Sequence, residues 1–245
     1  MVEGVAYSEE GHQNLLLAEK RAGQYYNWIY EEIRPFLSGD IFEIGSGIGA
    51  CSKLIVCDNP GSRIILSDGD PRCVTALRER FEGHRNVRCL LIDITNKSDL
   101  RSLEYKPDCA IAINVLEHIK DDVAALNNVY DVLNRGGHFV LLVPAHKFLY
   151  NCLDEAIGHY RRYTMEELKR KVSQTEFRLI KTFYFNFSSI IVWYMNGNLL
   201  HKTVMSESVF SAGNNLIPAV KFFERYIIRK KLGISLIAVL KKAER

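Results

Sequence analysis

The stretch Ile41-Phe42-Glu43-Ile44-Gly45-Ser46-Gly47-Ile48-Gly49 decides how the rest of the sequence is interpreted. An apolar run leads into three glycines at alternate positions, which predicts a strand, a tight loop and then a helix at about residues 50–57. Glycine suits such a loop because a Cβ would clash where the backbone turns sharply or approaches a ligand. The N–H groups of the loop and of the helix N-terminus suit an anionic or hydroxyl-rich ligand. The stretch therefore predicts a site for a nucleotide-like cofactor.

The glycine loop alone does not select the cofactor. Gly45, Gly47 and Ala50 also fit the G-x-G-x-x-G/A dinucleotide fingerprint, and Asp68 lies about where its ribose-binding acid is expected. A glycine loop that serves only as a structural turn between a strand and a helix is the other alternative. The remaining sequence has to distinguish these hypotheses.

Length and composition indicate a soluble globular protein. A chain of 245 residues, 47% hydrophobic and 25% charged, fits one large α/β domain with an elaboration, or two small domains. The net charge of +3 is mild, and the basic runs 169–171 and 229–231 are short, so we expect no nucleic-acid partner.

The cysteines and the N-terminus indicate a cytoplasmic protein. The six cysteines (51, 57, 73, 89, 109 and 152) show neither a C-x-x-C pair nor metal-ligand spacing, so we expect buried free thiols in a reducing cytoplasm. The acidic N-terminus lacks the apolar segment of a signal peptide. No run of 18 apolar residues is present, so no transmembrane helix is expected.

Strands alternate with helices through the first 145 residues. A helical pattern at 12–36, broken by Gly23, precedes five predicted strands, and this alternation favours a parallel sheet with helices on both faces. The strands are expected at 40–44, 63–67, 87–92, 109–113 and 138–143, with helices at 50–57, 71–81, 98–103 and 121–133 between them.

A polar residue follows or ends each of these strands. Ligands of parallel α/β sheets bind at the carboxyl ends of the strands, so these side chains are expected to converge on one edge. They are Glu43, Asp68, Asp93, Asn114 and His146. Asp68 is placed to accept hydrogen bonds from the two hydroxyls of a ribose. Asp70 is expected to cap the helix that begins at Pro71.

The pattern changes after the fifth strand. A polar, aromatic loop is expected at 151–163, and Thr164 begins a capping box and a helix to about residue 173. A sixth strand is expected at 177–185, an apolar and aromatic stretch at 187–200, a polar lid or loop at 201–215, a helix at 217–228 with Pro218 in its first turn, and a final strand at 234–240.

The ordered motifs resemble those of class I S-adenosylmethionine-dependent methyltransferases. The resemblance rests on the glycine loop with Glu43, then Asp68, Asp93, Asn114-Val115-Leu116-Glu117-His118 and the turn 135–137, and it covers roughly residues 25–145. The sixth and seventh strands also fit the antiparallel end of that family's sheet, which a dehydrogenase would not be expected to have.

The resemblance implies how the cofactor would be held. In that family the glycine loop approaches the methionine part of S-adenosylmethionine, the acid after the second strand binds the ribose, and the acid after the third strand binds the adenine. S-adenosylhomocysteine would be the product. The expected cofactor-binding residues are Glu43, Gly45, Ser46, Gly47, Gly49, Asp68, Gly69, Asp93, Ile94 and Asn114.

A closer similarity covers nearly the whole chain. The segments 26–30, 143–146, 153–155, 158–164 and 233–237 resemble a bacterial group of small methyltransferases found beside, or fused to, family 2 glycosyltransferases. The substrates of that group are poorly defined, so this similarity indicates the fold and the cofactor without naming an acceptor.

Two histidines are candidates for a general base. Transfer to a hydroxyl benefits from a base, and imidazole has a suitable pKa. His146 follows the fifth strand and is expected to face the methyl group of the cofactor, whereas His159 belongs to a loop that would roof the same pocket. The alternative for each is a histidine that only orders a loop.

Aromatic and basic residues are the candidates for substrate binding. They are Trp28, His118, Tyr160, Arg161, Arg162 and Tyr163. Arg161 and Arg162 would hold a carboxylate or phosphate, or else form an internal ion pair with Asp154 or Glu155, as we expect of at least one of them.

The residues that follow the fourth and fifth strands are expected to line the pocket as polar side chains rather than to bind a metal. Glu117 and His118, with Asn114 and His146, resemble the Glu-x-x-Glu-His arrangement of some RNA methyltransferases, but Asn114 replaces the first acid. We therefore expect no metal. For the aromatic residues 183–200, core packing is favoured over an apolar substrate pocket or a membrane contact.

We expect a single Rossmann-like α/β domain with a seven-stranded, mostly parallel sheet and an antiparallel last strand. Its parts would be an N-terminal helical cover (1–39), a cofactor-binding half (40–146), a substrate cap with strand six (147–232) and the last strand and tail (233–245). The predicted reaction is methyl transfer to an oxygen, in preference to nitrogen or carbon, of a small-molecule or lipid- or sugar-linked acceptor. The alternatives are a nicotinamide-dependent oxidoreductase and a non-catalytic cofactor-binding partner subunit. The sequence does not indicate an oligomeric state.

Overall fold

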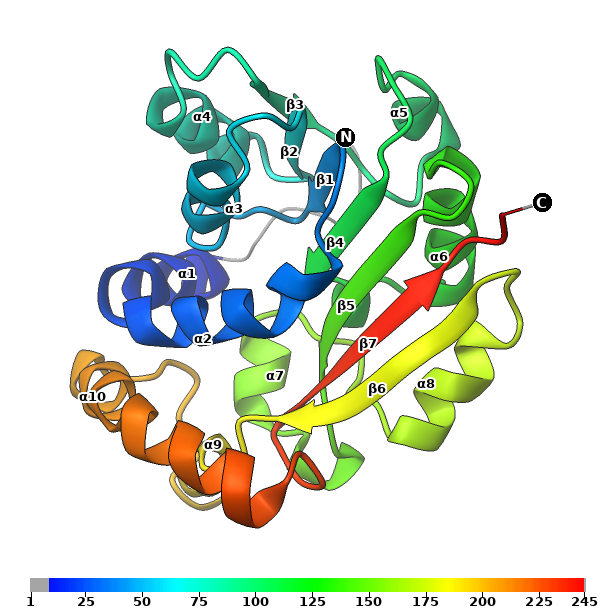
Figure 1. The fold of residues 1–245 in the computed structure, drawn as a ribbon. Coiled ribbons are helices and arrows are strands. Elements are labelled where there is room, and N and C mark those ends of the chain that lie inside the picture. The colour runs from blue at the N-terminus through cyan, green and yellow to red at the C-terminus, as the bar shows by residue number, and fades with distance from the viewer. Residues whose placement is uncertain (1–8, 245) are drawn as a thin grey trace.

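A computed structural model describes residues 9–244, and seven strands form one sheet in the order β3-β2-β1-β4-β5-β7-β6 (Figure 1). Neighbouring strands from β3 to β5 are parallel, whereas β7 runs antiparallel to both β5 and β6. The predicted mostly parallel sheet with an antiparallel last strand is confirmed. The strands are β1 (Ile41–Ile44), β2 (Ile64–Asp68), β3 (Val87–Leu91), β4 (Cys109–Ile113), β5 (His138–Pro144), β6 (Arg178–Phe185) and β7 (Ser235–Lys241).

Helices connect the strands and extend beyond them. They are α1 (Glu9–Arg21), α2 (Gly23–Ile33), α3 (Ser52–Asp58), α4 (Pro71–Arg80), α5 (Lys97–Arg101), α6 (Asp122–Val132), α7 (Cys152–Ala156), α8 (Met165–Val172), α9 (Ser189–Trp193) and α10 (Glu207–Phe223). Short helical turns complete the chain: η1 (Arg34–Phe36), η2 (Leu116–His118), η3 (Lys147–Leu149), and the π-helical η4 (Tyr194–Leu199) and η5 (Glu224–Ile228).

Two helix starts follow the capping chemistry expected of them. The Asp70 side chain accepts a hydrogen bond from the Arg72 N–H at the start of α4, with Pro71 in the first helical position. The Thr164 side chain accepts one from the Glu167 N–H at the start of α8, which is the N-cap bond of the predicted capping box. These caps satisfy backbone donors that would otherwise lack a partner at the helix N-termini.

The sheet buries both of its faces, so the fold has three layers (Figure 1). Phe42 and Ala110 belong to a core shared with α5, α6 and α8, whereas Ile41 and Ile111 belong to a core shared with α2, α3 and α4. Alternate residues of a strand point to opposite faces, which explains the division. The continuous apolar strands of the sequence reflect this two-sided burial.

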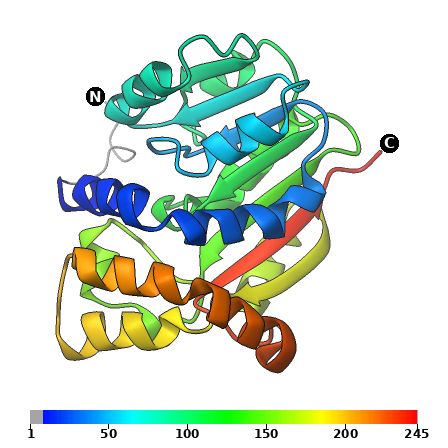
Figure 2. The same cartoon turned by 60° about the vertical axis from the view of Figure 1, so that its left-hand side comes forward.

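The helices at the two ends of the chain lie together. α10 contacts both α1 and α2, and Figure 2 shows α1 and α2 end to end with α10 running alongside them. α7 contacts η4. These elements surround the carboxyl ends of β1 and β4, where the functional site is expected.

Two predictions about the second half of the chain are wrong. The expected loop at 151–163 contains α7, whose N-terminus is capped by Asn151 and Asp154. The expected lid or loop at 201–215 is helical from Glu207, and Pro218 lies inside α10 rather than in its first turn.

All six cysteines are free, as expected, but only Cys51, Cys73 and Cys109 are buried. None of the helices in the described part of the chain combines the length and the apolar character needed to cross a membrane.

Candidate active site

The glycine loop follows β1 in a left-handed conformation. Gly45, Gly47 and Gly49 have φ angles of 67°, 55° and 93°, a region that residues with a Cβ rarely adopt. The Ser46 N–H donates to the Ser67 carbonyl at 2.8 Å, which ties the loop to the end of β2. The Gly47 N–H donates to Asp68 Oδ2 at 2.9 Å. The predicted strand, loop and helix are therefore confirmed, although α3 begins at Ser52, two residues later than expected.

A cavity of about 580 Å³ opens beside this loop. Its volume lies in the range of about 300–1,000 Å³ usual for small-molecule sites. Of the predicted cofactor-binding residues, Glu43, Gly45, Ser46, Gly47 and Asn114 line it. The sheet edge thus brings the ends of β1 and β4 to one cavity.

Glu43 is a buried acid in this wall. Burial raises its pKa to about 7, although the hydroxyl of Ser52 donates to Oε2 and partly opposes the shift. A positively charged group in the cavity would favour the ionised form of this carboxylate.

The other predicted cofactor residues lie behind or beside the cavity wall. Asp68 is 3% exposed and accepts hydrogen bonds from the N–H groups of Gly47 and Asp70. The Asp93 carboxylate accepts two bonds from Thr95, the helix-approach turn typical of such positions. Ile94 packs in the core. Gly49 faces α4, and Gly69 does not line the cavity. The roles of these five residues in binding stay predictions.

His146 does not line this cavity, contrary to expectation. Its backbone adopts a φ of 65°, and its ring stacks on Tyr184 of β6 with centroids 5.0 Å apart and an interplanar angle of 3°. The left-handed turn after β5 directs the side chain toward β6.

His159 lines the cavity, and a hydrogen bond to Asp154 fixes the orientation of its ring. Its Nδ1 lies 2.7 Å from Asp154 Oδ1, and the residue is 8% exposed. Burial lowers the pKa of His159, an effect that Asp154 only partly opposes. The ring is therefore neutral at pH 7, and a proton on Nδ1 leaves the Nε2 lone pair able to act as a base.

Arg162 also lines the cavity, but its positive charge is paired with Asp154. Its Nε donates to both carboxylate oxygens at 2.8 and 2.9 Å, both side chains are buried, and the guanidinium lies 4.6 Å from the ring centroid of Trp193. The expected internal ion pair is confirmed for this arginine.

Arg161 and Tyr163 are held by Asp122 and do not line the cavity. Arg161 Nη1 and the Tyr163 hydroxyl donate to Asp122 Oδ2 at 2.7 and 2.9 Å. Trp28 packs against Phe185 in the core, with ring centroids 4.4 Å apart. Tyr160 is 47% exposed and outside the cavity. Among the six predicted substrate residues, His118 and Arg162 line the cavity.

Several cavity residues were not predicted from the sequence. Tyr25 and Tyr26 line the cavity from α2, whereas Trp28 on the same helix was the predicted residue. The apolar wall is completed by residues of α9 and α10, which include Ile191, Val192, Phe210, Ile217 and Val220. The many apolar and aromatic residues at 187–200 indicated such a wall in the sequence, although core packing was the favoured interpretation.

The comparisons with known proteins agree with this geometry. Residues 42–139 match a family described as a methyltransferase domain. The chain is 22% identical over 147 residues to the malonyl-[acyl-carrier protein] O-methyltransferase 1 of Ilyobacter polytropus, and the match covers 58% of this chain and 53% of that protein. It is 28% identical over 158 residues to "Probable polyketide synthase 42" of Dictyostelium discoideum, which covers 55% of this chain but 6% of that protein. The matches thus span about half of the first relative and a small part of the second.

A solved structure shares the fold over almost the whole chain. Phosphoethanolamine N-methyltransferase 2 of Haemonchus contortus, solved in complex with S-adenosyl-L-methionine, has a TM-score of 0.63 and 16% identity. The similarity covers 95% of this chain and 57% of that one. The chain therefore has the Rossmann-like methyltransferase fold, and residues 42–139 within it match the methyltransferase domain family.

Proposed function

We propose that the protein transfers the methyl group of S-adenosylmethionine to an oxygen of a small-molecule or lipid-linked acceptor. The observation that carries the proposal is one cavity that joins the glycine loop to His118 and His159. A cofactor on the loop and an acceptor beside the histidines would share this cavity. The matched methyltransferase domain supports the same reaction.

The cofactor lies along the ends of β1 and β2 in this proposal. The left-handed loop approaches its methionine part, and Glu43 supplies a negative charge near the cationic sulfonium and ammonium groups. Asp68 accepts hydrogen bonds from the ribose hydroxyls, in place of the one that it now receives from Gly47.

Methyl transfer needs little from the protein beyond positioning. The acceptor hydroxyl loses its proton to His159 Nε2, and its oxygen forms a bond to the methyl carbon as the carbon–sulfur bond breaks. The bonding pair stays on sulfur, so S-adenosylhomocysteine leaves as a neutral thioether. The apolar wall from α9 and α10 favours an acceptor with a substantial apolar part.

We expect Asp68→Asn to weaken the binding of S-adenosylmethionine about 10- to 100-fold, because hydrogen bonds to a charged group contribute about 1.5–3 kcal/mol. Calorimetric titration of the pure protein measures this. Asp131→Asn is the control, since Asp131 is exposed on α6. Equal affinity of Asp68→Asn and the unmodified protein would remove Asp68 from the site.

The same titration has a pH dependence. Burial, with the nearby charge of Asp70, raises the pKa of Asp68 to about 6, against the hydrogen bonds from surrounding N–H groups. The ribose hydroxyls need the ionised acceptor, so affinity falls as pH drops through 6 and is about tenfold lower at pH 5 than at pH 8. Asp68→Asn abolishes this contribution.

We also propose that α10 and η5 contact an anionic membrane surface. Leu216, Phe222, Tyr226 and Ile227 are all more than half exposed. The exposed basic residues Arg225, Arg229 and Lys231 lie next to them in the sequence. Apolar side chains flanked by positive charge suit the boundary of an anionic bilayer, where a lipid-linked acceptor would lie.

Co-sedimentation with vesicles tests this contact. The protein is expected to sediment with vesicles that contain phosphatidylglycerol, and Phe222→Ser combined with Ile227→Ser should reduce the bound fraction severalfold. Leu91→Ser is the matched control, since Leu91 is 52% exposed on β3. No sedimentation of the unmodified protein, or none lost in the double variant, contradicts the contact.

A further inference from the structure

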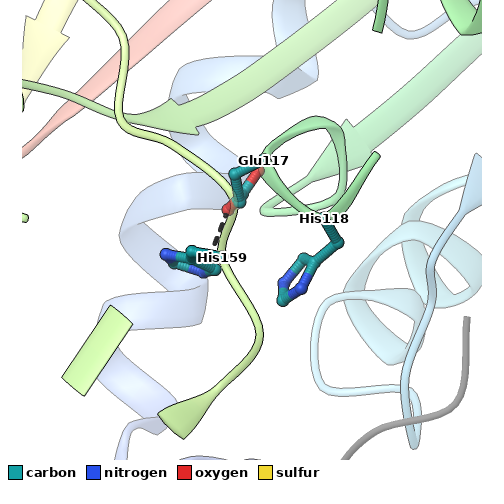
Figure 3. Close-up of side chains that lie close together, drawn as sticks. All are labelled: Glu117, His118 and His159. Carbon is teal, nitrogen blue, oxygen red and sulfur yellow. Dashed lines mark ion pairs between the residues drawn. The ribbon is translucent and has the colours of Figure 1, made fainter. Parts of the chain in front are cut away.

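Glu117, His118 and His159 bring three metal-binding side chains together at the cavity. Glu117 and His118 are adjacent on η2, and His159 follows α7 (Figure 3). One carboxylate oxygen and one nitrogen of each ring lie within 4.8 Å of one another. The two imidazole rings have centroids 4.7 Å apart at an interplanar angle of 77°.

Glu117 is a fully buried carboxyl group. The residue is 0% exposed, and neither of its carboxylate oxygens has a hydrogen-bond partner among the described residues. The ring nitrogen of His159 at 3.6 Å is too distant for one. A buried carboxylate in this state is costly, because it has lost its hydration without gaining a compensating partner. A cation would stabilise the ionised form.

Both histidines are oriented by hydrogen bonds on the other side of the ring. His159 Nδ1 lies 2.7 Å from Asp154 Oδ1, and His118 Nδ1 lies 3.2 Å from the Gly158 carbonyl oxygen. Each acceptor favours the tautomer with the proton on Nδ1, which leaves the lone pair on Nε2. Metal-binding histidines are typically held in this way by a carboxylate or a backbone carbonyl.

The charged groups around the cluster do not neutralise an ionised Glu117. Glu117 and Asp154 carry two negative charges when both are ionised, and Arg162 carries one positive charge that is paired with Asp154. The cluster then has a net charge of −1 before any ion binds. A divalent ion reverses that sign without leaving a carboxylate uncompensated.

We propose that Glu117, His118 and His159 bind one divalent transition-metal ion through a carboxylate oxygen and two imidazole nitrogens. Two histidines and one carboxylate form the ligand set of several zinc and iron(II) enzymes, and three protein ligands leave a position open for substrate. The described geometry is wider than a bound site, so ligand distances of about 2.0–2.2 Å require the side chains to close around the ion.

The site has a consequence for the acceptor, which rests on the proposed methyl transfer. His118 and His159 line the cavity beside the glycine loop, so an acceptor oxygen bound to the ion would face the methyl group. A metal-bound hydroxyl is more acidic, so its proton passes to solvent water. His159 then holds the ion instead of taking the proton.

Metal titration tests the site without any methyl acceptor. Protein freed of metal by a chelator and then dialysed is titrated with Zn²⁺ by calorimetry, and bound Co²⁺ is followed by its visible absorption. One ion per chain is expected to bind. Glu117→Gln and His118→Gln are each expected to weaken binding at least about tenfold. Circular dichroism confirms that both variants are folded.

His138→Gln is the matched control, because His138 lies at the start of β5, away from the carboxyl ends of the strands. It should bind the ion as the unmodified protein does. Failure of the unmodified protein to bind Zn²⁺ or Co²⁺, or equal affinity in folded Glu117→Gln, overturns the metal site. Either result leaves the proposed methyl transfer standing with His159 as the base, because that proposal is tested separately, by the binding of the cofactor.

Discussion

Gly45→Ala is expected to weaken the binding of S-adenosylhomocysteine at least about tenfold. Gly45 has a φ of 67°, and a non-glycine residue in this left-handed region costs about 1–2 kcal/mol. A Cβ there would also overlap Cγ2 of Val115. The loop must shift to relieve this overlap, and its N–H groups move with it. Since each 1.4 kcal/mol corresponds to about a factor of ten, the conformational cost alone approaches the predicted loss.

Two further variants show whether the loss has this cause. Gly61→Ala is the matched control, because a Cβ added at Gly61 would meet no atom within 4 Å and the residue has no positive φ, so the affinity of this variant should be unchanged. Val115→Ala added to Gly45→Ala removes the nearest methyl group and should recover part of the affinity. Normal binding by Gly45→Ala would show that the loop does not shape the cofactor site.

Asp154→Asn is expected to lower the free energy of unfolding by about 3–5 kcal/mol. The Asp154 carboxylate is 0% exposed and is hydrogen-bonded to Arg162, His159 and the Trp193 ring nitrogen. Without its charge, the Arg162 guanidinium stays buried and unpaired. Removing one partner of a buried ion pair is more costly than the net contribution of the intact pair, because the remaining charge is desolvated.

Denaturant unfolding followed by circular dichroism measures this change. Asp131→Asn is the control, because its ion pair with Lys97 is exposed and such pairs contribute about 0–1 kcal/mol. A loss below about 1 kcal/mol in Asp154→Asn would mean that Arg162 is not held as a buried charge in solution.

The structure of residues 40–146 could be predicted from the sequence, because neighbouring residues determine most of it. Glycines at alternate positions, Asp70 before Pro71 and the apolar strands each determine structure through neighbouring residues, and the predicted order of elements there is confirmed. The second half depends more on tertiary contacts. Pro218 suggested a helix start, but α10 begins at Glu207 and accommodates the proline in its interior. α7 has only five residues, too few to show a helical pattern within the polar stretch around it.

Tertiary contacts also limited how far the candidate site could be predicted from the sequence. The Glu117-His118 pair was visible in the sequence, but its partner was sought at His146 after β5. The chain instead brings His159 to the pair, because Asp154 and the turn after α7 orient that ring, while φ at His146 directs its ring onto β6. Sequence spacing does not reveal which of two histidines returns to a cluster about 40 residues away.

Calorimetric titration of the pure protein with S-adenosylhomocysteine, in parallel with NADH, tests the proposed cofactor site most directly. We expect one molecule of S-adenosylhomocysteine to bind per chain with a dissociation constant in the micromolar range or below, and no binding of NADH. Binding of NADH without binding of S-adenosylhomocysteine would contradict the assignment and favour a nicotinamide-dependent oxidoreductase.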